Sequence, residues 1–227
     1  MWLIFAISCV TVAEEDGLVA WSGWVYSDPE TSDDTRLVEG TVSVRSEPFA
    51  AGEQYAAEQP YDDYLGYWEV RVPPGLPVNV VVQPIEGRRT LWAGDTPAST
   101  GNWFAGALFS AGDAWLDGVL ELLTDEGDDW LARLDSGLVL VLGAPGNDSI
   151  GCEDLLVTAE GGIPSIPACW ALNEDLEPVR VEAGPVEWFL ALVPPGEVSV
   201  GIGTSVERYG AEAGDVVMPW YLTGGEE

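Results

Sequence analysis

One phrase occurs twice in this chain and limits what the chain can fold into. Residues 67–82 and 187–202 each contain an aromatic-led apolar run, then Val-Pro-Pro-Gly, then a second apolar run. The two Val-Pro-Pro-Gly copies begin at Val72 and Val193, an offset of 121 residues. Strand pairing breaks at such a phrase, because proline has no backbone N–H to donate to a neighbouring strand and glycine adopts a positive φ angle. Each copy therefore predicts two strands joined at a hinge.

Two shorter strings recur in the same order around this phrase. Gly-Leu-Val begins at Gly17 and Gly137, and Ala-Gly-Asp begins at Ala93 and Ala213, both with an offset of 120 residues. Three matches at nearly one period indicate a duplicated unit, and 227 residues suffice for two ordinary domains. We therefore predict an export signal over 1–13, a first unit over 17–110, a linker over 111–136 and a second unit over 137–223.

Within each unit the apolar pattern is typical of strands. Short runs rich in β-branched and aromatic residues are separated by Gly and Pro turns, which favours an all-β fold of two tandem β-sandwiches. Trp24, Trp68 and Trp188 lie in these runs, and we expect them in the cores. The predicted strands are 18–26, 37–45, 68–72, 78–82, 91–92 and 103–109, then one starting at 137, 155–159, 188–193, 198–202 and 215–222.

The linker has a different pattern. Apolar residues between Trp115 and Leu123 recur at helical spacing behind Asp113, a candidate N-cap, and Gly127 interrupts the run. This spacing predicts one or two short helical turns between the units.

Several strings in the first unit match a known kind of domain. They are Gly23–Val25, Gly40–Val44, Asp63 with Gly66–Trp68, and Pro74-Gly75 before a closing hairpin, and the second unit keeps Pro195-Gly196. Together they resemble the carboxypeptidase regulatory-like domain, a transthyretin-like, immunoglobulin-like β-sandwich common in exported bacterial proteins. The resemblance implies two tandem copies that act as non-catalytic accessory, spacer or adhesive modules of the bacterial cell envelope.

The charge of the chain excludes some partners. Its 39 acidic residues outnumber 8 basic ones, all of them arginine, and the formal net charge is −31. Such a surface repels nucleic-acid phosphates and anionic lipid headgroups, so we expect neither as a partner. It attracts cations and basic proteins, and the partners we expect are an envelope protein or a glycan.

The amino terminus predicts export. Residues 2–7 form a short apolar stretch. The string Ala6-Ile7-Ser8-Cys9, which overlaps its end, resembles a bacterial lipobox. By that resemblance Cys9 becomes the acylated first residue of an outer-membrane-anchored protein, so that a lipid is its only contact with the membrane. The alternative is cleavage after Ala13 and secretion.

Once Cys9 is removed or acylated, Cys152 and Cys169 remain as an even pair in the second unit. In an oxidising compartment they would close a loop of about 16 residues, a disulfide that contributes about 3 kcal/mol. The alternative is two buried thiols that never meet, since free cysteine packs as a small hydrophobic residue.

Catalysis has little support in this composition. The chain has no histidine and no lysine, which excludes Ser-His and Cys-His pairs, Schiff bases and a lysine-bearing phosphate loop. A carboxylate-pair hydrolase remains as an alternative, because acids are plentiful. We therefore expect no enzyme, no catalytic residue and no bound cofactor.

Two acidic clusters, over 28–34 and 125–129, are candidate calcium ligands, although neither has the full ligand spacing of an EF-hand. Tyr61, Tyr64 and Tyr67 lie beside Asp62 and Asp63 and could stack on sugar rings. These tyrosines predict a carbohydrate-binding module as the alternative function. Their other interpretation is packing of a loop over the sandwich, with the hydroxyl groups left in water.

Overall fold

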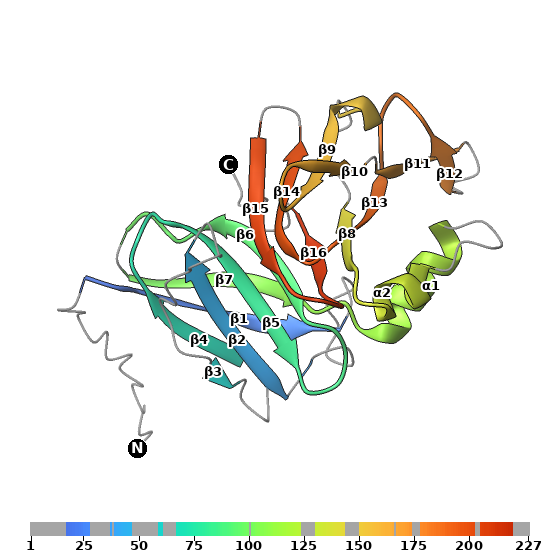
Figure 1. The fold of residues 1–227 in the computed structure, drawn as a ribbon. Helices are drawn as coiled ribbons and strands as arrows, with labels where there is room; N and C mark the ends of the chain where they lie inside the picture. Colours follow the sequence, from blue (N-terminus) through green and yellow to red (C-terminus); the bar gives the residue numbers. More distant parts are fainter. Residues whose placement is uncertain are drawn as a thin grey trace, which may run out of the picture.

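The computed structural model describes residues 17–27, 37, 39–46, 59–60, 67–99, 101–123, 130–143, 150–165, 167–173, 178–202 and 205–219. Most of these residues lie in β-strands, which confirms the all-β prediction (Figure 1). The strands of the first unit are β1 (Val19–Tyr26), β2 (Gly40–Ser46), β3 (Gln59–Pro60), β4 (Tyr67–Val72), β5 (Pro77–Pro84), β6 (Thr90–Asp95) and β7 (Gly101–Phe109).

The second unit contains more strands than its sequence pattern predicts. They are β8 (Val139–Gly143), β9 (Leu155–Ala159), β10 (Ile163–Ser165), β11 (Ala168–Leu172), β12 (Pro178–Val181), β13 (Trp188–Val193), β14 (Gly196–Ile202), β15 (Ser205–Ala211) and β16 (Val216–Met218), with the short 3₁₀ helix η3 (Cys152–Asp154) before β9. Four of these strands, β10, β11, β12 and β15, fall where no strand is predicted.

The duplication seen in the sequence is also present in the strand topology. In the first unit β1 lies between β4, which is antiparallel to it, and β7, which is parallel to it. In the second unit β8 lies between antiparallel β13 and parallel β16. The β5–β6 hairpin beside β2 likewise corresponds to the β14–β15 hairpin beside β9. The Val-Pro-Pro-Gly phrase joins β4 to β5 in one unit and β13 to β14 in the other.

The two units share one sheet, and in this respect the structure departs from two independent sandwiches. Strand β16 pairs in parallel with β8 of its own unit and with β6 of the first unit. A nine-stranded sheet results, in the order β12-β11-β13-β8-β16-β6-β5-β2-β3. The three-stranded sheet β4-β1-β7 and the four-stranded sheet β10-β9-β14-β15 complete the fold.

The shared sheet carries a core on each face. Val80 and Leu140 point into a first core with residues of β1 and β4, whereas Val81 and Val141 point into a second core with residues of β9 and β14. Residues on both faces are therefore buried, which explains why β5 and β8 contain unbroken apolar runs rather than alternating ones. Trp68 is buried in the first core as expected, and Trp24 and Trp188 pack partly buried against it.

The linker is more helical than its sequence predicts. It forms α1 (Asp113–Leu123) and α2 (Trp130–Asp135). Leu116, Leu120 and Leu123 of α1 are buried in the first core. The helices thus cover part of the shared sheet on the face that β4-β1-β7 covers elsewhere, and β10-β9-β14-β15 lies on the other face (Figure 1).

Candidate functional site

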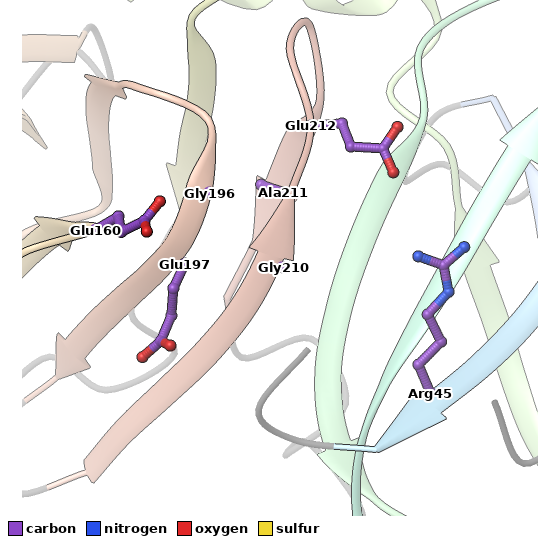
Figure 2. A pocket seen from close by; sticks show the side chains of 7 residues that line it. All are labelled: Arg45, Glu160, Gly196, Glu197, Gly210, Ala211 and Glu212. Atoms are coloured by element: carbon purple, nitrogen blue, oxygen red, sulfur yellow. The ribbon is translucent and has the colours of Figure 1, made fainter. Parts of the chain in front are cut away.

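A cavity of about 360 Å³ lies where the second unit meets the first. Glu160, beyond β9, and Glu197, on β14, line one side, and Arg45 of β2 lines the other (Figure 2). The remaining wall is formed by Gly196, Gly210, Ala211 and Glu212. The cavity therefore places carboxylates of one unit opposite a guanidinium of the other.

Small residues at the turn before β14 make room for this cavity. Gly196 ends the second Val-Pro-Pro-Gly phrase with a φ of +129°, a conformation that side chains other than glycine rarely adopt. A Cβ added there would lie 2.6 Å from Oε2 of Glu160. The Glu160 carboxylate thus rests against bare backbone, in space that any side chain at position 196 would fill.

A second cavity of about 210 Å³ adjoins the first, since Glu160 and Glu197 line both. Its other lining residues are Thr158, Ala159, Gly161, Gly162 and Ser199. We call this smaller space the acidic pocket. It offers hydroxyl groups, polar backbone groups and two carboxylates. This set is suited to binding a cationic or hydroxylated group.

Asn79 anchors the first-unit side of the large cavity. It is the cross-strand partner of Arg45 and is fully buried. Its side-chain Nδ2 donates a hydrogen bond to the Arg208 carbonyl oxygen at 2.9 Å. This bond ties β5 to β15 and so fixes the spacing between the two sides.

Glu212 belongs to an ion-pair network that joins the units. Arg89 donates from Nε and Nη2 to the two carboxylate oxygens of Asp215, at 3.0 and 2.7 Å, and from Nη1 to Glu212 at 2.7 Å. The Arg89 and Asp215 side chains are 12% and 5% exposed, whereas Glu212 is 72% exposed. Asp215 ends the second Ala-Gly-Asp string, so this repeated string forms part of the contact between the units.

Burial raises the pKa of the Asp215 carboxyl, although the hydrogen bonds from Arg89 and from the Glu212 N–H act to lower it. Burial acts to lower the pKa of Arg89, but the hydrogen bonds and charges of Asp215 and Glu212 reverse this effect and raise it. The raised Arg89 pKa favours a charged pair and the raised Asp215 pKa opposes one. The Asp215 carboxyl is the more deeply buried of the two groups, so burial sets the direction in which its pKa moves.

Arg88, the neighbouring residue, binds the linker instead. Its Nε lies 3.1 Å from Oδ1 of Asp113 at the start of α1, and its Nη2 donates to Oδ1 of Asp135 at the end of α2, at 2.7 Å. The pair Arg88-Arg89 therefore connects the first unit to the linker helices and to the β15–β16 turn.

The structure joins Cys152 and Cys169 in a disulfide, with their Cα atoms 6.0 Å apart. Cys152 begins η3, just before β9, and Cys169 lies in β11 of the shared sheet. The bond therefore links two layers of the second unit, and the alternative of two thiols that never meet does not apply to this structure.

Of the predicted tyrosine site only Tyr67 is described, because Tyr61 and Tyr64 lie outside the described residues. Tyr67 is half-buried, and its hydroxyl donates to Oε2 of Glu69 at 3.3 Å. Its ring lies edge-to-face with Trp24, with centroids 6.4 Å apart and planes at 70°. This pair is not a coplanar stacking surface.

Cys9, the export signal and both acidic clusters also lie outside the described residues. Within the described ranges, no group of three or more His, Cys, Asp or Glu residues is placed to hold a metal ion. No helix among those residues has the length and apolar character needed to cross a membrane.

No protein-family model matches the chain, and neither does any curated protein. Several solved structures give weak matches, among them the following two. A 9R-lipoxygenase from Cyanothece PCC8801 is 12% identical over 44% of this chain and 18% of its own, with a TM-score of 0.30. The Bacillus anthracis TIE protein is 10% identical over 88% of this chain and 33% of its own, also with a TM-score of 0.30. These low scores carry no argument about fold or function, and neither match indicates a carboxypeptidase regulatory-like domain.

Proposed function

We propose that this protein is a non-catalytic binding module of the bacterial cell envelope, built from two carboxypeptidase regulatory-like units. It is exported and then either anchored in the outer membrane through acylated Cys9 or secreted after cleavage following Ala13. The observation that carries this proposal is the disulfide between Cys152 and Cys169, because structural disulfides persist in oxidising compartments. The exposed acidic surface suits a binding role outside the cytoplasm.

The chemistry of the cavities supports a binding role over a catalytic one. Their ionisable side chains are glutamates and one arginine, in a chain without histidine or lysine. The buried charged residue with a shifted pKa, Asp215, is held by Arg89 and the Glu212 N–H. Burial of the carboxyl raises the pKa of Asp215 against the effect of these hydrogen bonds, so the shift needs no reaction to explain it.

Carbohydrate binding through Tyr61, Tyr64 and Tyr67 stays a prediction. The edge-to-face contact of Tyr67 with Trp24 does not favour it, because sugars stack on exposed ring faces. A glycan array would test it: binding that Tyr64→Ala abolishes would replace our proposal with this alternative.

Cell fractionation and mass spectrometry test the proposed location. We expect the protein in the envelope or the medium, starting at acylated Cys9 or just after Ala13, with Cys152 and Cys169 oxidised. An intact Met1 in the cytoplasmic fraction, together with reduced cysteines, would contradict the proposal.

Hydrolysis assays test the non-catalytic role. We expect no turnover of glycoside substrates, and the same result for Glu160→Gln and Glu197→Gln. Turnover by the native protein that either substitution removes would identify a carboxylate-pair hydrolase instead.

A further inference from the structure

The outer face of the sheet β10-β9-β14-β15 has an exposed apolar row. Gly201 of β14 pairs with Leu156 of β9 on one side and with Val206 of β15 on the other. Paired residues point to the same face, so the two side chains flank a glycine that leaves a shallow gap between them. Leu156 is 54% exposed and Val206 is 62% exposed. We call these three residues the apolar row.

The acidic pocket opens on the same strands. Glu197 precedes Gly201 by four positions on β14 and therefore shares its face. At about 3.3 Å per residue, the two positions are about 13 Å apart. Ser199 lies between them and lines the acidic pocket.

The charges at this surface indicate the sign of the charge that a partner carries. Within the part of the chain that the structure describes, neither Glu160 nor Glu197 forms an ion pair with an arginine. A second copy of this chain is a poor candidate, because two molecules of net charge −31 repel each other. The same negative charge attracts a basic partner.

We propose that the apolar row and the acidic pocket form one docking surface for an extended, basic segment of a partner protein. An apolar side chain of the segment sits over Gly201, between Leu156 and Val206. An arginine or lysine four residues away enters the acidic pocket, because residues at even spacing in an extended segment point to the same side. The inference rests on the proposed binding function and names the class of partner.

Two synthetic peptides of identical composition test this surface. In one, leucine and arginine are four residues apart in a Ser/Gly background, and in the other they are adjacent. Each peptide is titrated into isotope-labelled full-length protein near physiological salt, and binding is followed by amide chemical shifts. We expect the first peptide to shift residues 156–162 and 197–201 and to bind roughly two- to fivefold more tightly than the second.

Variants with the same change of charge or polarity elsewhere on the surface provide the control. Glu197→Gln and Leu156→Ser should each weaken binding of the first peptide by roughly two- to fivefold. Glu182→Gln and Ile85→Ser, which alter an exposed acid and an exposed apolar residue elsewhere, should leave it unchanged. Amide spectra of the free variants establish that each is folded.

The proposal is overturned if neither peptide binds, if both bind equally, or if Glu197→Gln and Glu182→Gln have the same effect. The last two results would mean general attraction to an acidic surface. None of these results would change the location of the protein or its lack of turnover, so the proposed function is tested separately.

Discussion

Two adjacent arginines provide ionic contacts between the parts of this molecule. Arg88 reaches Asp113 and Asp135 on the linker helices, and Arg89 reaches Glu212 and Asp215 in the second unit. The Arg89–Asp215 pair is bidentate and mostly removed from water, so loss of one partner leaves a buried charge unpaired. Contacts of Arg88 with exposed acids contribute less.

Asp215→Ala should therefore lower the free energy of unfolding by about 3 kcal/mol, because Arg89 and the Glu212 N–H both lose the buried oxygen atoms that accept their hydrogen bonds. Glu212→Ala is the matched control. Its side chain is 72% exposed, and we expect a loss of about 0–1 kcal/mol. Denaturant unfolding of both variants checks the difference, and equal losses would show that burial of the pair is unimportant.

Asp215 should titrate above the usual range of aspartates, because burial raises its pKa. The folded chain then holds this proton more tightly than the unfolded chain. The contribution of Asp215 to stability is thus greatest below the ordinary aspartate pKa and falls as the pH rises to its raised value. A carboxyl ¹³C NMR titration measures this pKa directly, and a value at or below the ordinary one would contradict the direction.

At the scale of elements, the two Val-Pro-Pro-Gly turns have diverged. Gly75 has a φ of +65°, and the nearest atom to an added Cβ would be Cα of Ala98 at 4.0 Å. Gly196 has a φ of +129° and the Glu160 carboxylate beside it. The residue after the glycine is Leu76 in the first unit and Glu197 in the second. One turn is thus a structural hinge, and the other also lines the candidate site.

Gly196→Ala should cost about 2–3 kcal/mol and Gly75→Ala about 1 kcal/mol, because alanine tolerates the left-handed region near +65° far better than a φ near +129°. Gly118→Ala in helix α1 is a useful control. Its added Cβ meets nothing within 4 Å, so we expect a gain of up to about 1 kcal/mol. Thermal or denaturant unfolding of the three variants checks the order, and equal costs at positions 75 and 196 would contradict it.

Sequence patterns located most strands of the first unit, because apolar runs bounded by Gly and Pro are local signals. They missed β10, β11, β12 and β15 of the second unit, and in β12 and β15 charged residues such as Arg180 and Glu207 break the apolar alternation. The candidate site was missed as well, because Arg45, Glu160 and Glu197 come together only through tertiary contacts. The sequence contained one signal of this site: directly after the repeated phrase, the second unit has Glu197 where the first unit has an apolar residue.

At the scale of the whole molecule, β16 joins the two duplicated units into one structure. Its parallel partners, β6 and β8, come from different units, and no local pattern predicts such a distant pairing. The expectation of two sandwiches described each unit's topology but not the sheet that they share. Because each core includes side chains from both units, we expect the units to unfold together.

The disulfide supports the second unit across its layers. Replacing Cys152 and Cys169 with serine should lower the free energy of unfolding by about 3 kcal/mol, because the unfolded chain regains the entropy of the closed loop. Denaturant unfolding of the native and double-serine proteins measures this loss. An unchanged midpoint would mean that the bond contributes nothing to the shared fold.

Backbone NMR of Val217 tests the central claim most directly, namely that β16 joins the units into one sheet. In the structure its cross-strand partners are Leu91 and Val141. We predict inter-strand NOEs from Val217 to both partners, the parallel pattern on each side, and one rotational correlation time for residues of both units. NOEs to a single partner, with the two units tumbling independently, would contradict the shared sheet.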